Sequence, residues 1–135
     1  MSAPYQWNPF TNNLDHTGAG GGGGSGYKWN VVTSADNPVI LQSDNGYIAK
    51  GSSPVNFVLP AAAIPGNAYF IKGYGNLWTL AQNALQRVSV SASTSTTGVT
   101  GGLAATQVKD FVELLCVTAD LEFDSIDSGG NITII

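Results

Sequence analysis

Beyond residue 26, hydrophobic and polar residues alternate in short runs that are separated by turn residues. A period of two places every second side chain on the same face of a β-strand, so each run predicts a strand with one buried face. No stretch repeats its apolar residues with the period of an α-helix over more than one or two turns. The clearest alternating sets are Tyr27, Trp29 and Val31; Val55, Phe57 and Leu59; and Val88 and Val90.

Turn residues divide these runs at intervals of roughly 8 to 12 residues, the spacing of an all-β sandwich or barrel. Asn45-Gly46 has the composition of a tight hairpin turn, and Pro65-Gly66 has that of a type II turn. Ala119-Asp120 is a short connection suited to another hairpin, whereas the polar, glycine-rich stretch 94–106 predicts a loop. We therefore expect an all-β domain over residues 27–135, built as a compact antiparallel β-sandwich or a barrel-like head.

Two segments precede this domain and differ from it in composition. Residues 1–17 combine aromatic residues with prolines, which hold the backbone extended. So short a segment cannot bury its aromatic side chains by itself, so it docks either on its own β domain or on another protein. Residues 18–26 are almost all glycine, and such a flexible joint favours docking on another protein. The predicted docking residues of this extended anchor are Tyr5, Trp7, Pro9, Phe10 and Leu14.

The charge of the chain limits its partners. Charged residues make up only 10% of the chain, and the net charge is −4. The five basic residues are scattered along the sequence, which argues against nucleic acid as a partner. Uncharged Ser and Thr surfaces are easily buried against another subunit, although some monomeric β-proteins share them. The final run NITII is a strand with exposed isoleucines, which also favours a homo-oligomer.

The start of the chain lacks the basic and apolar segments of a signal peptide, and no apolar run is long enough to cross a membrane. These features predict a protein that is made in a cytoplasm, without membrane insertion. It either stays there or leaves as part of a larger particle.

The residues that carry most enzyme chemistry are scarce. Cys116 is the one cysteine and lies in an apolar run, and the one histidine, His16, lies beside the glycine tract. No metal-ligand spacing is present, and the glycine tract is followed by a strand pattern rather than by a phosphate-binding helix. Glu122 and Asp124 alternate with apolar neighbours, which is typical of a solvated strand face. We predict no catalytic residues, metal or cofactor; a hydrolase that uses these carboxylates is the weakest alternative.

Aromatic side chains offer a different chemistry, because they bind sugars by stacking. Tyr47 and Tyr74 lie beside glycines near predicted turns, where exposure is expected, so both are candidate glycan contacts. Trp78 alternates with Leu80 and is expected in the core.

Several motifs follow one another in a distinctive order. An Asn-Gly-Tyr turn is followed by VNFVLP, GYGNLWTLAQN, a Thr/Gly loop, the acidic strand DFVELLC and a closing GNIT. In this order, residues 44–134 resemble a β module of trimeric phage tail-fibre and head-fibre proteins. The N-terminal WNPFTNNLD is similar to a short motif near the start of small phage structural proteins.

This resemblance implies a non-enzymatic virion structural protein that assembles as a homotrimer and presents its β head outward. The absence of a long shaft before the module favours a small fibre, tip or decoration protein. Residues 1–17 would dock on other virion structural proteins, and the head would contact a host-surface glycan. The alternative is a free glycan-binding module of a bacterial surface or secreted system.

Overall fold

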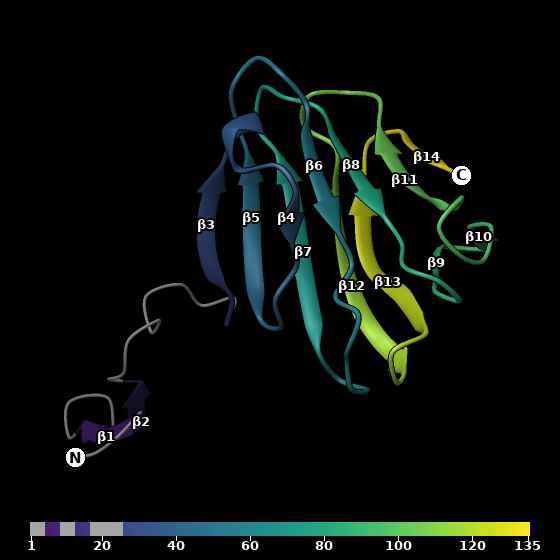
Figure 1. The fold of residues 1–135 in the computed structure, drawn as a ribbon. Coiled ribbons are helices and arrows are strands. Elements are labelled where there is room, and N and C mark those ends of the chain that lie inside the picture. Colours follow the sequence, from purple (N-terminus) through teal and green to yellow (C-terminus); the bar gives the residue numbers. More distant parts are fainter. Residues whose placement is uncertain (1–4, 9–12, 17–25) are drawn as a thin grey trace.

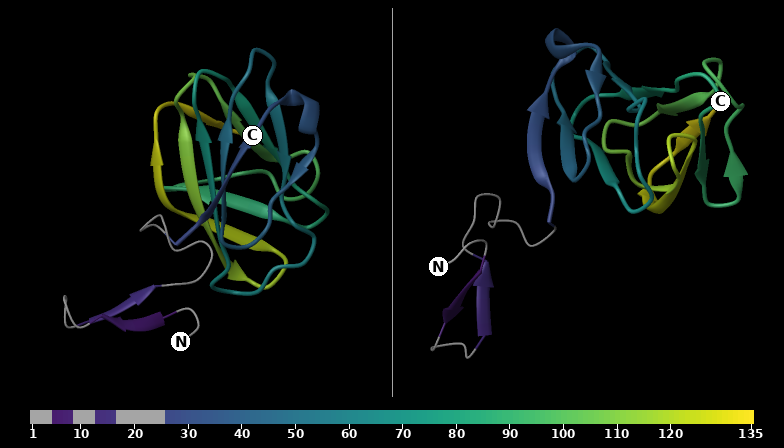
Figure 2. Two further views of the ribbon diagram at one scale, coloured as in Figure 1. Left: turned by 90° about the vertical axis from the view of Figure 1, so that its left-hand side faces the viewer. Right: turned by 60° about the horizontal axis from the view of Figure 1, so that its bottom comes forward.

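In the computed structural model, two β-sheets face each other, which confirms the predicted all-β sandwich (Figures 1 and 2). The structure describes residues 5–8, 13–16 and 26–135. The seven-stranded sheet has the order β10 (Ser93–Thr94), β9 (Arg87–Val90), β13 (Glu122–Gly129), β12 (Phe111–Thr118), β7 (Ala68–Gly73), β5 (Asn45–Ala49) and β3 (Lys28–Val32). The five-stranded sheet has the order β14 (Ile132–Ile134), β11 (Gly102–Ala105), β8 (Trp78–Ala81), β6 (Val55–Val58) and β4 (Val39–Ile40).

The strand directions are mixed and not all antiparallel as predicted, because the first half of the domain winds as a coil. From β3 to β8 the chain passes to the other sheet after every strand (Figure 1). As a result, β3, β5 and β7 are parallel neighbours in one sheet, and β4, β6 and β8 are parallel neighbours in the other. A short 3₁₀ turn, η1 (Ser34–Asp36), lies on the first crossing and begins with a capping box on Thr33.

This coil overturns the hairpin predicted at Asn45-Gly46. Both residues lie inside β5, whose neighbours β3 and β7 run parallel to it. The chain turns earlier, where the Asn45 backbone N–H donates to the Gln42 carbonyl at 3.2 Å and Asp44 has a positive φ of 61°. An Asn-Gly pair tolerates a tight turn but is not confined to one, and here the glycine is needed for a different reason. A side-chain carbon at Gly46 would lie 2.6 Å from the Trp29 ring.

The second half of the domain is mainly antiparallel and contains the predicted hairpin. β12 pairs with β13, and Thr118 lies opposite Glu122, so residues 119–121 make the connection. Leu121 donates its backbone N–H to the Thr118 carbonyl, and Asp120 has a φ of 64°. The turn at Pro65-Gly66 is also confirmed, with a hydrogen bond of 3.0 Å from the Asn67 N–H to the Ile64 carbonyl.

The predicted loop over residues 94–106 is wrong in its last part. Residues Gly102–Ala105 form β11, an inner strand of the five-stranded sheet, with Leu103 and Ala105 buried. Its small side chains give no clear apolar alternation. They also permit close packing, since a side-chain carbon at Gly102 would lie 2.3 Å from the Leu80 carbonyl oxygen.

The core fills the space between the sheets with alternate residues of their strands. Trp78 is fully buried, as predicted, and donates its indole N–H to the Asp110 carbonyl at 3.0 Å. The predicted alternation of Tyr27, Trp29 and Val31 is real, but Trp29 and Val31 lie on the outer face, and Val32 faces the core. The other large buried side chains include Phe57, Tyr69, Ile71, Leu80, Leu114 and Phe123.

The N-terminal segment forms a two-stranded sheet of its own. β1 (Tyr5–Asn8) and β2 (Asn13–His16) pair antiparallel, and Trp7 lies opposite Leu14. The described residues of this segment are thus extended strands that run antiparallel to each other. Of the predicted docking residues, Pro9 and Phe10 lie outside the described residues, as does the joint apart from Gly26.

At the C-terminus, β14 forms an edge of the five-stranded sheet. Ile132 and Ile134 pack against the core, and Ile135 remains about half exposed. The described residues contain no helix that is long and apolar enough to cross a membrane.

Candidate functional site: a tyrosine surrounded by lysines

The most distinctive exposed side chains lie on the outer face of the seven-stranded sheet, where β5 and β7 end. β5 and β7 are parallel, with Ala49 opposite Gly73, so the residues that follow them are neighbours. These residues are Lys50 and Tyr74, and the Tyr74 backbone N–H donates to the Ala49 carbonyl at 3.0 Å.

A third segment, residues 106–110, packs against the end of β7 and brings Lys109 to the same place. Gly73 and Gly75 donate their backbone N–H groups to the carbonyls of Asp110 and Val108, each at 2.9 Å. This approach requires glycine at position 73, because a side-chain carbon there would lie 2.9 Å from the Val108 carbonyl oxygen.

Two ammonium groups lie close to the Tyr74 ring, which is 54% exposed. The Lys50 Nζ is 5.6 Å from the ring centroid, and the Lys109 Nζ is 5.4 Å from it. A third, the Lys72 Nζ, donates a hydrogen bond to the Lys109 carbonyl at 2.9 Å and lies 5.4 Å from the Phe111 centroid. Cation–π attraction of this kind holds a lysine beside an aromatic ring while its ammonium group stays in solvent.

Beside Tyr74 the surface is hollowed into a shallow depression of about 300 Å³. Val31 and Ile48 supply aliphatic surface, and Lys50, Lys72 and Tyr74 complete the lining. We call these five residues together with Lys109 the Tyr74 site. It combines an exposed aromatic ring, a small apolar surface and three positive charges.

Within residues 26–135, no carboxylate forms an ion pair with the three lysines of the Tyr74 site. The ion pair that this part of the structure contains is that of Arg87 and Glu122. Asp110 follows Lys109 in sequence, but its carboxylate is buried. Its two oxygens accept hydrogen bonds from backbone N–H groups, namely those of Thr106, Gln107 and Asn131.

A row of aromatic rings adjoins the Tyr74 site on the same face. Neighbouring ring centroids lie between 5.1 and 6.0 Å apart, and Phe70 and Phe111 are stacked with an interplanar angle of 17°. Tyr27 donates its hydroxyl to the Glu113 carboxylate at 2.6 Å, and burial together with this carboxylate raises the pKa of Tyr27 well above its ordinary value. Sequence reasoning missed this row, although the alternation of Phe70 with buried residues of β7 was a signal for it. The row consists of Tyr27, Trp29, Phe70 and Phe111.

Of the two predicted glycan contacts, the structure exposes Tyr74 and buries Tyr47. Tyr47 is only 5% exposed, so the prediction of an exposed ring is wrong. Its side chain faces inward from β5, packs against Phe57 with 5.5 Å between centroids, and accepts a hydrogen bond from the Gln42 N–H. A glycine neighbour suggested a turn at Tyr47, whereas β5 in fact continues through it.

A larger depression, of about 410 Å³, lies between the edge strands β3 and β4. Its lining is largely polar, with Lys28, Asn30 and Asp36 among its residues. The aromatic side chain in this lining is Tyr47, which is too deeply buried to offer a ring face to a ligand. The Tyr74 site is therefore the better candidate for stacking.

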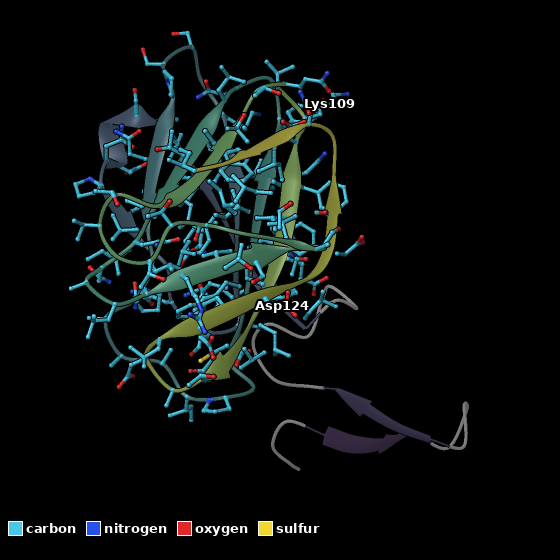
Figure 3. The ribbon with its side chains drawn as sticks, turned by 90° about the vertical axis from the view of Figure 1, so that its right-hand side faces the viewer. Lys109 and Asp124 are labelled. Atoms are coloured by element: carbon cyan, nitrogen blue, oxygen red, sulfur yellow. The ribbon has the colours of Figure 1, made fainter. Side chains whose placement is uncertain are left out.

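Among the described residues, the side chains considered for catalysis occupy environments that are typical of ordinary core and surface residues. Cys116 is buried, and burial raises the pKa of its thiol, which keeps it protonated and unreactive. Glu122 accepts hydrogen bonds from Thr118 and Arg87, which lower its pKa, and Asp124 is exposed. Figure 3 shows Asp124 well separated from Lys109 of the Tyr74 site. Residues 26–135 contain no cluster of three or more His, Cys, Asp or Glu side chains that would hold a metal ion.

Comparison with known proteins leaves the family open. No protein-family model matches the sequence, and no curated protein shows significant similarity to it.

Proposed function

We propose that this chain is a non-enzymatic virion structural protein of phage, of the small fibre, tip or decoration kind. Its N-terminal segment docks on other virion proteins, three copies of its β head associate, and the head attaches to the host surface. The observation that carries this proposal is the chemical difference between the two outer faces of the sandwich. One face is suited to a copy of the same chain, and the other offers the Tyr74 site.

The strands of the five-stranded sheet contain no charged residue. Alternation with the buried residues places small or uncharged side chains on its outer face. Such a face loses little solvation when a similar face covers it, because no ion must be stripped of water. We call it the charge-free face, and its residues are Ile40, Asn56, Val58, Thr79, Ala81, Ala104 and Thr133.

The charged strand residues of the β head all lie on the seven-stranded sheet, for example Lys72 on β7, Glu113 on β12 and Asp124 on β13. This face is therefore the one suited to solvent and to polar ligands. A sandwich with one neutral face and one charged face is expected where the neutral face is covered by other copies. The copy number of three comes from the resemblance to trimeric fibre modules.

Deletion of residues 1–17 is expected to abolish incorporation of the protein into phage particles while leaving the β head folded. The reason is that Tyr5, Trp7, Phe10 and their neighbours are then missing, and aromatic anchors dominate binding at interfaces. The measurement is immunoblotting of purified particles, with circular dichroism of the deleted protein as a control for folding. Unchanged incorporation would mean that the segment is not the anchor.

The proposed trimer is tested by Ala81→Lys, which puts a charge on the charge-free face at the end of its central strand, β8. Ala81 is exposed in the single chain, so the substitution leaves the fold intact. We expect a wild-type mass of three times 14.0 kDa in solution, and 14.0 kDa for the variant, because a desolvated lysine opposes association. Val117→Lys, at an exposed position of the other sheet, serves as the matched control. A monomeric wild-type protein contradicts the trimer.

A free glycan-binding module of a bacterial surface or secreted system remains the second candidate, because the Tyr74 site supports it equally. The two functions differ in the particle: a free module binds its glycan but does not co-purify with virions. The incorporation experiment above therefore distinguishes them.

A further inference from the structure

We propose that the Tyr74 site binds an acidic saccharide, with a sugar ring stacked on Tyr74 and its carboxylate or phosphate group between Lys50 and Lys109. The inference rests on the proposed attachment function and specifies the class of ligand that the head recognises. A site of this kind would bind acidic surface glycans in preference to neutral ones.

The stacking half of the inference rests on the exposure and the support of Tyr74. Tyr74 is more than half exposed, while its backbone N–H is held by the hydrogen bond to the Ala49 carbonyl. Gly73 lets residues 108–110 pack closely against the end of β7, and Gly75 donates its N–H to the Val108 carbonyl, so Tyr74 is presented on a rigid base. An aromatic ring held in this way binds an apolar sugar face at little cost in conformational entropy.

The anionic half rests on the lysines. Lys50 and Lys109 lie on the same ring, so their ammonium groups are no more than about 11 Å apart, the sum of the two distances to the centroid. Lys72 adds a third positive charge within the same lining. This separation is about one Debye length, so the two ammonium groups still repel each other, and an anion bound between them reduces that repulsion.

The clustering of three lysines is significant because basic residues are rare in this chain. The chain has only five basic residues and a net charge of −4, yet two of the five lie over the Tyr74 ring and a third lies over the neighbouring Phe111 ring. Their placement depends on the register of β5 with β7 and on the packing of residues 106–110, so it is a property of the fold.

The same face also limits the size of the anion. Glu113 on β12 lies opposite Phe70, two residues along β7 from Lys72, and Asp124 and Asp127 lie one strand further away on β13. A long polyanion such as a nucleic acid would be repelled by these carboxylates, whereas a single acidic sugar unit fits the depression of about 300 Å³. The expected ligand is therefore one or two sugar rings with one acidic group.

The experiment is a calorimetric titration of the full chain with four probes at about 50 mM salt. Glucuronic acid supplies a carboxylate, glucose 6-phosphate supplies a phosphate, glucose is the neutral match, and inorganic phosphate is the bare anion. We expect both acidic sugars, or one of them, to bind roughly tenfold more tightly than glucose and than inorganic phosphate. Which acidic sugar binds better identifies the anionic group. Equal binding of glucose overturns the anionic half, and equal binding of inorganic phosphate overturns the stacking half.

Substitutions test whether the acidic sugar binds at the Tyr74 site. Tyr74→Ala is expected to weaken binding of the acidic sugar about fivefold to tenfold, and Lys109→Gln severalfold. Arg87→Gln makes the same change in charge on the same sheet, at an exposed residue outside the Tyr74 site, and is expected to leave binding unchanged. A loss in Arg87→Gln equal to that in Lys109→Gln means that only net charge matters, which overturns the site.

A cell-binding assay separates this inference from the proposed function. If labelled full-length protein binds host cells but none of the acidic probes, the ligand class is wrong and attachment stands. If it binds neither cells nor probes, the attachment function itself is wrong. Binding to cells that Tyr74→Ala abolishes, together with binding of an acidic probe, supports both.

Discussion

Replacement of Asp110 by alanine is expected to lower the free energy of unfolding by about 3 kcal/mol or more. The Asp110 carboxylate is buried and accepts three backbone hydrogen bonds, from Thr106 and Gln107 at one oxygen and from Asn131 at the other. Alanine removes the acceptor of these three part-buried hydrogen bonds, and each donor left unsatisfied costs about 1 to 3 kcal/mol.

The Asp110 substitution is measured by urea denaturation that is followed by far-UV circular dichroism. Asp124→Ala is the control, because Asp124 is exposed and its loss should change stability by less than about 0.5 kcal/mol. Asp110→Asn is expected to fall between the two, since an amide retains one acceptor oxygen and turns an N–H₂ group toward the donors at the other position. A fall of less than about 1 kcal/mol in Asp110→Ala would show that water replaces the carboxylate.

The Asp110 variant also links stability to the Tyr74 site. Residues 106–110 present Lys109 and accept the hydrogen bonds of Gly73 and Gly75. Loosening this segment should therefore weaken binding of an acidic sugar even at temperatures where the sandwich stays folded.

Replacement of Trp78 by alanine is expected to cost about 3 to 5 kcal/mol, the range for large aromatic residues in a protein core. Trp78 is fully buried on β8, and its indole N–H donates to the Asp110 carbonyl. The variant therefore loses both packing between the two sheets and a hydrogen bond that ties the five-stranded sheet to the start of β12.

Two further variants separate these contributions. Trp78→Phe retains most of the packing and loses the N–H donor, so it should cost clearly less than Trp78→Ala. Trp29→Ala removes a tryptophan that is 39% exposed on the outer face and should also cost less. Urea midpoints of the three variants provide the comparison, and an equal loss in Trp29→Ala and Trp78→Ala would contradict the assignment of Trp78 to the core.

Local pattern was sufficient to predict the strands but not how they are connected. Period-two alternation gave the class of fold, and the apolar neighbours of Trp78 placed it correctly in the core. The coil from β3 to β8 left no local signal, because a crossing between sheets and a hairpin both begin with turn residues. Asn45-Gly46 shows this, since its composition predicts a hairpin while long-range pairing with β3 and β7 keeps it inside a strand.

Only part of the candidate site could be predicted from the sequence. Tyr74 was predicted from its glycine neighbours, which do mark a turn at the end of β7. The lysines were counted as scattered because they lie at positions 50, 72 and 109, on segments that only the sheet register and the packing of residues 106–110 bring together. Tyr47 has a glycine neighbour as well, and the difference between the two tyrosines lies in which face of the sheet each one occupies.

The uneven placement of charge on the two sheets allows the two proposed contacts to be controlled separately. No strand of the five-stranded sheet contains a group that titrates, so contacts made through the charge-free face should be indifferent to acidity and to ionic strength. Contacts made through the lysines of the Tyr74 site should weaken as salt rises. A salt wash would then release the head from an acidic surface without dismantling the assembly that presents it.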